Sequence, residues 1–261
     1  MNNIKKNSVV ALIPARKGSK SIRYKNIKYL NGHPLISYSI VAALNCPSID
    51  EVFVTTDSEK IKKISKKYGA KVPFLRPKNI SNDNSKDITF FNHFLNFRTK
   101  QNLFLPEFIV HLSPTCPFRD INDISSAIKK IKSIKDSTSL RSVSEAKFSP
   151  YKMFKEKNGF LSGLFKELKG EYYNSPRQSF GQTYIPNGHV DIIKTNHLLK
   201  NKNLHGNKII SFVSKRILKS TISFDVDIDS KDDFRNAKKI VYKKTFLINK
   251  KGKKFKYIKK I

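Results

Sequence analysis

A basic loop rich in Gly and Ser is the first segment whose residues could do chemistry. Residues 14–26, PARKGSKSIRYKN, place five cations around Gly18, Ser19 and Ser21, directly after an apolar run. Free backbone N–H groups, hydroxyls and cations together suit a polyphosphate. The Gly-Lys-Ser/Thr ending of a Walker loop and the GxGxxG fingerprint are both missing. By composition, the loop is either a phosphate site or a solvated turn.

Three carboxylates near the C-terminus form a second candidate site in an otherwise basic chain. Asp225, Asp227 and Asp229 alternate with apolar residues at the end of a predicted strand. In an extended chain they share one side, where they repel one another unless a cation neutralises them. Carboxylates without nearby His or Cys indicate Mg²⁺, held together with substrate phosphates. The alternative is a helix cap at Asp229 or Ser230, which accounts for one acid but not for the others.

Strands and helices alternate along most of the chain, which predicts a mostly parallel sheet covered by helices on both faces. We expect strands at residues 8–13, 51–55, 71–75, 108–112, 139–143, 189–193, 209–213 and 222–226. We expect helices at residues 34–45, 58–68, 86–98, 120–134 and 230–242. Ligands of such sheets bind beyond the carboxyl ends of the strands, where the basic loop is expected to lie.

The alternation breaks at residues 145–186, which contain three Pro, four Gly and nine aromatic residues. This segment predicts a small inserted subdomain that forms a lid, a substrate pocket or a subunit interface. The alternative is a satellite hairpin with its own small core.

Composition narrows the class of protein. Apolar stretches fall far short of the roughly 18 residues of a membrane helix, so no membrane span is expected. Cys46 and Cys116 lie far apart, which favours a reducing compartment and a cytoplasmic protein. At 261 residues, the chain is long enough for one large domain with an insertion.

The formal charge of +32 invites a nucleic-acid interpretation. However, 43 Lys and 9 Arg are spread along the whole chain, which favours a solvated surface over a dedicated polyanion site. The exception is residues 243–261, with nine Lys and no acid, which form either a basic tail or a final strand pair around Lys251 and Gly252.

Six short motifs follow one another along the chain: residues 13–20 with Lys25 and Asn26, Arg76-Pro77, residues 114–119, residues 176–178, residues 186–188 and Asp227-Ile228-Asp229. In this order they resemble the motifs of the acylneuraminate cytidylyltransferases, the CMP-sialic acid synthetases. The resemblance implies a three-layer α/β/α Rossmann-like nucleotidyltransferase domain at residues 8–242, with residues 145–186 as a lid or dimerisation insertion, followed by a basic C-terminal tail at 243–261. It also implies a homodimer that uses Mg²⁺ to make a CMP-sugar and pyrophosphate from CTP and a nine-carbon acidic sugar, for surface glycan biosynthesis.

The resemblance also assigns roles to single residues. Arg16 and Lys25 hold the CTP phosphates, with Ser19 and Asn26 beside them. By the same resemblance, Arg76, Asp83 and Asp87 line the cytosine pocket. The sugar acid binds Lys152, Arg177 and Asn187, and the metal binds Asp227 and Asp229. Two alternatives remain open for the proton of the sugar hydroxyl. Either Asp229 accepts it, or the metal lowers the pKa of the hydroxyl far enough that no protein base is needed.

This chain departs from the family pattern at the predicted sugar pocket. Ser113 stands where relatives often have Gln, and His189 stands where they have Ala. We therefore expect both residues to bind the substrate and to favour a nonulosonic acid other than N-acetylneuraminate, of the legionaminic or pseudaminic kind. The alternatives are a cytidylyltransferase for the eight-carbon keto acid Kdo and an inactive, polyanion-binding relative.

Overall fold

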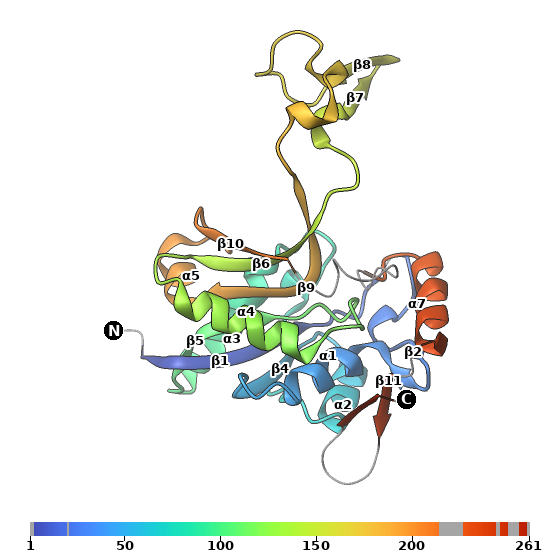
Figure 1. Ribbon diagram of the computed structural model, residues 1–261. Helices are drawn as coiled ribbons and strands as arrows, with labels where there is room; N and C mark the ends of the chain where they lie inside the picture. Colours follow the sequence, from blue (N-terminus) through green and yellow to red (C-terminus); the bar gives the residue numbers. More distant parts are fainter. Residues whose placement is uncertain (1–2, 20, 214–226, 244–245, 250–255, 260–261) are drawn as a thin grey trace.

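A six-stranded sheet forms the centre of the computed structural model (Figure 1), which describes residues 3–19, 21–213, 227–243, 246–249 and 256–259. The strands lie in the order β10-β6-β9-β5-β1-β4. In chain order they are β1 (Ile4–Pro14), β4 (Glu51–Thr55), β5 (Leu105–His111), β6 (Ser139–Glu145), β9 (Tyr184–Lys194) and β10 (Ile209–Phe212). All pairs are parallel except those of β9, which runs antiparallel to β5 and β6.

Helices cover both faces of this sheet, which confirms the predicted three-layer fold. One face carries α1 (Leu35–Leu44), α2 (Glu59–Lys67), α4 (Ile121–Ser133) and α7 (Lys231–Lys243), and the other carries α3 (Asp87–Lys100) and α5 (Thr195–Asn201). Ala11 and Ile13 of β1 belong to the first core, whereas Val10 and Leu12 belong to the second. The first strand reads as a continuous apolar run because both of its faces are buried.

Most predicted elements are confirmed, but the strand expected at residues 71–75 is wrong. Only Lys71 pairs there: its N–H donates to Val52 O, and its carbonyl oxygen accepts from Val54 N. Pro73 has no N–H to extend the ladder. The short helix α5 and the two-residue hairpin of β2 (Tyr29–Leu30) and β3 (His33–Pro34) were not expected. Lys20, Asp225 and the strand expected at 222–226 lie outside the described residues.

The insertion projects away from the sheet between β6 and β9 (Figure 1). It contains an antiparallel hairpin of β7 (Phe154–Lys157) and β8 (Phe160–Gly163), and the 3-10 turns η3 (Pro150–Lys152), η4 (Tyr172–Asn174) and η5 (Arg177–Ser179). Tyr151 stacks on Phe180 at 4.7 Å between ring centroids, so the insertion has aromatic packing of its own. Phe148 and Phe160 remain 76% and 80% exposed. The insertion therefore offers apolar surface that its own packing does not cover.

Two short strands follow α7 near the C-terminus, β11 (Phe246–Asn249) and β12 (Lys256–Lys259). They pair antiparallel, as in the strand pair that the sequence left as one of two alternatives. A further 3-10 turn, η2 (Lys78–Ile80), precedes α3, and η1 (Lys25–Ile27) follows the basic loop.

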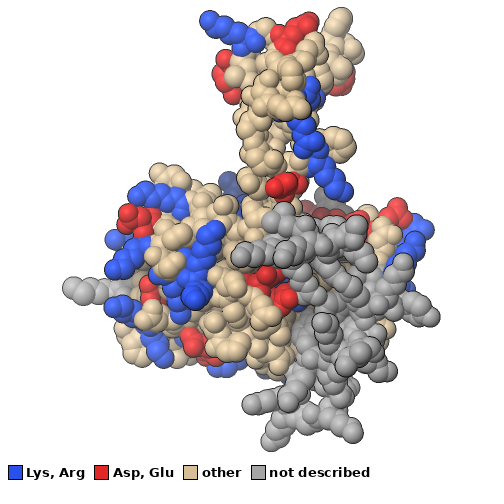
Figure 2. Space-filling model, in the orientation of Figure 1, with Lys and Arg blue, Asp and Glu red and all other residues tan. Residues whose placement is uncertain are grey.

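Charged side chains are mixed on the surface. Figure 2 shows Lys and Arg dispersed among acids over the sheet domain and the insertion, rather than gathered into one stripe, on the face drawn. None of the helices in the described part of the chain has the length and apolar character needed to cross a membrane.

Candidate active site

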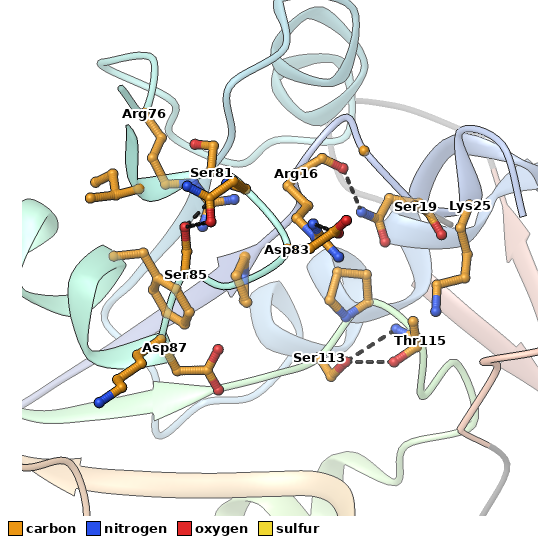
Figure 3. A pocket seen from close by; sticks show the side chains of 18 of the residues that line it. Arg16, Ser19, Lys25, Arg76, Ser81, Asp83, Ser85, Asp87, Ser113 and Thr115 are labelled. Carbon is orange, nitrogen blue, oxygen red and sulfur yellow. Dashed lines mark hydrogen bonds and ion pairs between the residues drawn. The ribbon is translucent and has the colours of Figure 1, made fainter. Parts of the chain in front are cut away.

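A cavity of about 370 Å³ opens at the carboxyl ends of β1 and β5, the position expected for a ligand site in such a sheet. Figure 3 shows Lys25 and Ser19 at one end, Arg76, Ser81 and Ser85 at the other, and Arg16 with Asp83 between them. The predicted site residues that line it are Arg16, Ser19, Lys25, Asn26, Arg76, Asp83, Asp87 and Ser113. The structure thus brings the predicted nucleotide contacts at residues 16–26, 76 and 83–87 into one cavity, together with Ser113 of the predicted sugar pocket.

Both predicted phosphate-binding cations of this cavity are paired with carboxylates. Arg16 Nη1 forms an ion pair with Asp83 Oδ1, and Lys25 Nζ lies 2.9 Å from Asp229 Oδ1. The Lys25 side chain is only 12% exposed, whereas that of Asp229 is 77% exposed. Such cations are held in place before a ligand arrives, and a polyphosphate can replace the exposed carboxylates.

Backbone hydrogen bonds hold the basic loop in its conformation. The N–H of Ala15 donates to Thr55 O at 2.9 Å, and that of Lys17 donates to Asp57 Oδ1 at 2.6 Å. Asn26 is buried and its Nδ2 donates to Arg16 O at 3.1 Å, so this amide positions the loop. A side chain at Gly18 would meet nothing within 4 Å, which leaves the backbone there open to a ligand.

Arg76 is a buried cation at the opposite end of the cavity. Its backbone N–H donates to Thr56 O at 2.7 Å, just beyond β4, and its guanidinium lies 5.6 Å from the ring centroid of Phe90. Burial lowers the pKa of Arg76, and the nearby acids Asp57 and Asp87 oppose that shift. Among the described residues, its Nε has no hydrogen-bond partner. A buried, incompletely satisfied guanidinium against an aromatic ring can bind the edge of a polar base.

The carboxylates Asp227 and Asp229 point away from the core, as the alternation predicted. Ile228 between them is fully buried, and its N–H donates to Thr115 O at 3.0 Å, which ties this loop to the end of β5. Capping of α7 is performed by Ser230, whose Oγ accepts from Asp233 N at 3.1 Å, while Asp233 accepts from Ser230 N at 2.7 Å. This reciprocal pair is a capping box, so neither Asp227 nor Asp229 is needed as the cap.

The donor set fits Mg²⁺ bound jointly with phosphates. No group of three or more His, Cys, Asp or Glu side chains that could hold a metal ion by itself occurs in the described residues. Mg²⁺ is usually held by one or two carboxylates together with substrate phosphates and waters. Asp227 and Asp229 supply two exposed carboxylates, and the second of them touches Lys25 of the basic loop.

Arg119 joins the loop after β5 to residues 188 and 189 of β9, at the rim beside the cavity. This guanidinium is 3% exposed and donates to the carbonyl oxygens of four residues and to one hydroxyl. The acceptors are Ser113 O at 2.6 Å, Cys116 O at 2.5 Å, Gly188 O at 3.0 Å, His189 O and Ser39 Oγ at 2.7 Å. The loop after β5 is therefore held against the start of β9 by one side chain.

The motif Pro186-Asn187-Gly188 lies on the other side of Arg119. Gly188 has a φ of +67°, and a Cβ there would lie 2.9 Å from Cys116 Sγ, so only glycine fits without strain. Asn187 is buried, and its Nδ2 donates to Ser144 Oγ at 2.9 Å. His189 is buried beside it and does not line the cavity, whereas Ser113 does and bonds Thr115 Oγ1 at 2.6 Å.

Asn187, His189, Asp227 and Asp229 do not line the cavity themselves but lie in segments bonded to its wall, whereas Lys152 and Arg177 lie apart from it. Both lie in the insertion, where Lys152 Nζ donates to Tyr173 O at 3.3 Å. Arg177 lines a separate cavity of about 350 Å³ within the insertion, together with Gln178, Phe180 and Gln182.

Several polar residues of the site were not expected from the sequence. They are Ser81, Asn82, Ser85, His111 and Thr115, which line the cavity, and Arg119, which positions its rim. The run SNDNS at 81–85 has the composition of a turn, and its hydrogen bonds between Asn82 and Ser85 form one. His111 could have been found in the sequence, because it is a polar residue at the end of an otherwise apolar strand.

Comparison with known proteins agrees with this geometry. The family model described as cytidylyltransferase matches residues 10–158. The N-acylneuraminate cytidylyltransferase of Escherichia coli O18:K1:H7 is 32% identical over 90% of this chain and 52% of its own length. The CMP-N,N'-diacetyllegionaminic acid synthase of Legionella pneumophila is 31% identical over 89% of this chain and 96% of its own length. The chain thus spans about half of the first relative and nearly all of the second.

A solved structure shares the fold. CMP:2-keto-3-deoxy-manno-octonic acid synthetase, in a complex with CTP, superposes with a TM-score of 0.62 over 90% of this chain and 99% of that protein. At 13% sequence identity, this likeness concerns the arrangement of the sheet and helices alone.

Proposed function

The chain belongs to the cytidylyltransferase family, of the acylneuraminate type, and from that premise we propose that it transfers CMP from CTP to the anomeric hydroxyl of a nonulosonic acid. The products are a CMP-sugar and pyrophosphate, for use in surface glycan biosynthesis. The observation that carries this proposal is the single cavity that joins the cations Arg16 and Lys25 to the buried Arg76.

The two ends of the cavity suit the two ends of a nucleoside triphosphate. The phosphates lie at Arg16, Lys25 and Ser19, where they replace the carboxylate of Asp83 on Arg16. Cytosine lies against Phe90 at the other end, with Arg76 and Asp87 beside it. In this pose the α-phosphate faces Ser113 and the start of β9.

Catalysis consists mainly of alignment and charge neutralisation. The anomeric hydroxyl attacks the α-phosphorus in line, the bond to the bridging oxygen breaks, and pyrophosphate leaves. Arg16 and Lys25 stabilise the charge that develops on that leaving group. The carboxylate of Asp229, which is exposed beside Lys25, accepts the hydroxyl proton.

Asp227 and Asp229 are the residues that would hold Mg²⁺. A bound Mg²⁺ supplies positive charge to the phosphate oxygens and acidifies a nearby hydroxyl. The remaining roles fall to side chains of this chain, which bind and orient the triphosphate.

The sugar is a nonulosonic acid other than N-acetylneuraminate, of the legionaminic or pseudaminic kind. Ser113 places a short hydroxyl on the cavity wall, and His189, which does not line the cavity, is buried in β9 two residues after Asn187. The relative from Legionella pneumophila, which this chain spans almost completely, is a synthase of CMP-N,N'-diacetyllegionaminic acid, and this agrees with a diamino sugar.

The working enzyme is a homodimer whose insertion, residues 145–186 of the domain at 8–242, packs on the partner and reaches its cavity. The exposed Phe148, Phe160 and Leu161 provide the contact surface, and Arg177 and Lys152 are the cations that meet the sugar carboxylate there. Residues 243–261, the predicted basic tail, follow this domain in the sequence. The enzyme acts in the cytoplasm, in agreement with its two free cysteines.

Pyrophosphate release with CTP and Mg²⁺, measured across a panel of sugar acids, tests the proposal. We expect release with a di-N-acetylated nonulosonic acid and much less with N-acetylneuraminate. Release with Kdo alone would replace the proposed sugar by an eight-carbon keto acid. No release with any acid would instead indicate an inactive, polyanion-binding relative. UTP and ATP in place of CTP are the matched controls.

A further inference from the structure

A row of three charged or titratable side chains crosses three neighbouring strands below the rim of the cavity. His111 of β5 lies opposite Asp191 of β9, and Asp191 lies opposite Arg141 of β6. Residues opposite one another in antiparallel strands have Cβ atoms about 4.5–5.5 Å apart. The three side chains therefore share one face of the sheet at contact distance.

This row is unusual for a buried sheet face. The next row consists of Ile109, Ile193 and Ser139, as expected for a strand packed under a helix. Asp191 is 7% exposed, and its Oδ2 lies 3.1 Å from Arg141 Nη2. Within the described part of the chain, Asp191 Oδ1 and Arg141 Nε have no hydrogen-bond partner. A buried carboxylate oxygen without a donor costs free energy that a purely structural row would avoid.

His111 connects this row to the cavity. It lines the cavity beside Asp87 and Ser113, and its ring centroid lies 5.7 Å from those of Phe90 and Phe91. Burial lowers the pKa of His111, Asp191 and Asp87 raise it, and the cations Arg119 and Arg141 lower it again, with a net lowering. The imidazole is thus neutral near pH 7, with one nitrogen that donates and one that accepts.

The row begins beside the proposed cytosine pocket, where His111 lies next to Phe90 and Asp87, and extends from there across β9 to β6. The basic loop follows β1 and Arg76 is anchored beyond β4, so these two proposed CTP contacts lie over the β1–β4 side of the sheet. His111, Asp191 and Arg141 lie on β5, β9 and β6, on the side that also carries Asn187. This is the side on which the acceptor sugar must enter to reach the α-phosphate.

We propose that His111 is a specificity-determining residue for the sugar acid, with Asp191 and Arg141 as the residues that position it; the inference rests on the proposed function. A ring N–H of His111 turned toward Asp191 Oδ1 would give that oxygen the donor that it lacks in the structure and would leave the other ring nitrogen as an acceptor toward the cavity. The group it recognises is a donor on the sugar, an amide N–H or a hydroxyl. Arg141 holds the carboxylate from the far side.

The test compares His111→Leu with His111→Gln, which retains a hydrogen-bonding group, and with His93→Leu as a matched control. His93 is a histidine of α3 that packs on Phe74 and is not among the residues that line the cavity. For each variant, KM and kcat are measured for a panel of nonulosonic acids, KM for CTP is measured separately, and CTP affinity without sugar is measured by calorimetry.

We expect His111→Leu to raise KM for the preferred sugar by about tenfold or more and to change the ranking of the acids, with CTP affinity unchanged within about twofold. His111→Gln recovers part of the loss, Asp191→Asn changes the ranking in the same direction, and His93→Leu does not. If His111→Leu fails to fold, His111→Gln and Asp191→Asn decide the outcome through the ranking of the acids.

A change confined to CTP affinity, or a ranking that stays the same in every His111 and Asp191 variant, would overturn this inference while leaving the proposed function intact. A wild-type chain that binds CTP but releases no pyrophosphate with any acid contradicts the proposed function itself, and this inference with it.

Discussion

Lys25 Nζ and Asp229 Oδ1 lie 2.9 Å apart, although the two residues are separated by 204 positions in the chain. The contact joins the basic loop after β1 to the acidic loop before α7, so the two segments that the sequence singled out form one site. The cation proposed to bind the phosphates and a carboxylate proposed to hold the metal are neighbours there.

Removal of either phosphate-binding cation should slow the chemical step. We expect Lys25→Ala and Arg16→Ala each to lower kcat by about 10²–10³-fold and to raise KM for CTP, because both charges face the leaving pyrophosphate in the proposed pose. Lys17→Ala is the control, since this exposed residue of the same loop does not line the cavity. An unchanged kcat in both variants would reduce their role to docking of the nucleotide.

Loss of one carboxylate of the acidic loop should abolish most of the metal-dependent activity. Asp227→Asn and Asp229→Asn are each expected to lower kcat by at least about 10²-fold and to shift the Mg²⁺ dependence to higher concentrations. The fold should survive, because both side chains are exposed and Ser230 and Asp233 cap α7. Asp232→Asn, also in this region, should leave the Mg²⁺ titration unchanged. Normal titrations in the first two variants would contradict the metal assignment.

Lengthening the side chain at Ser113 should change the choice of sugar. Ser113→Gln restores the residue that relatives often have, fills space on the cavity wall and breaks the 2.6 Å hydrogen bond to Thr115 Oγ1. We expect the ratio of kcat/KM for N-acetylneuraminate over a di-N-acetylated analogue to rise by about tenfold. Competition between the two acids in one reaction measures this ratio directly, and an unaltered ratio would remove Ser113 from the sugar pocket.

Arg119 should stabilise the fold as well as position the rim. Arg119→Lys cannot make all five hydrogen bonds of the guanidinium, and we expect the free energy of unfolding to fall by about 1–3 kcal/mol. Urea denaturation followed by circular dichroism measures the loss. The control is Arg235→Lys on the exposed side of α7, for which the change should stay within about 0.5 kcal/mol. Equal midpoints for the two variants would contradict this role.

If the insertion completes the partner's site, two inactive variants should complement each other. Arg177→Ala and Arg16→Ala are expected to be nearly inactive alone. After unfolding and refolding together, about half of the dimers are mixed, and each mixed dimer has one intact site, so activity should recover to about a quarter of the wild-type value. Each variant refolded with itself is the control. Absence of recovery while mixed dimers form would show that Arg177 acts within its own subunit.

The order of strands and helices could be predicted because local patterns carry it. Residues 9–13 are apolar without interruption because β1 is buried on both faces, and Ser58 and Asp120 begin helices because their side chains accept from the first turn. The strand expected at 71–75 was predicted wrongly, because overall composition was followed and the effect of Pro73 was not. Its composition resembles that of a strand, but Pro73 removes the N–H that the sheet would need.

The candidate site was only partly accessible from the sequence. The basic loop and the acidic run could be identified because dense charge of one sign stands out at two places in the chain, and the family resemblance then assigned roles to Arg16, Lys25, Asp227 and Asp229. Which cation meets which carboxylate could not be identified, because Lys25 reaches Asp229, and Arg16 reaches Asp83, across the carboxyl ends of the sheet. Such contacts depend on the order of the strands.

The sequence by itself determined the class of fold, the two charged segments and the break at residues 145–186, since each of these is a property of neighbouring residues. Only the tertiary structure decided that His111, Asp191 and Arg141 form one row, because the register of β5, β9 and β6 aligns them. It also decided that Arg119 binds two loops and that Arg177 lies away from the cavity. The pairing of strands distant in the chain is set by burial of the whole sheet, and no short segment carries that information.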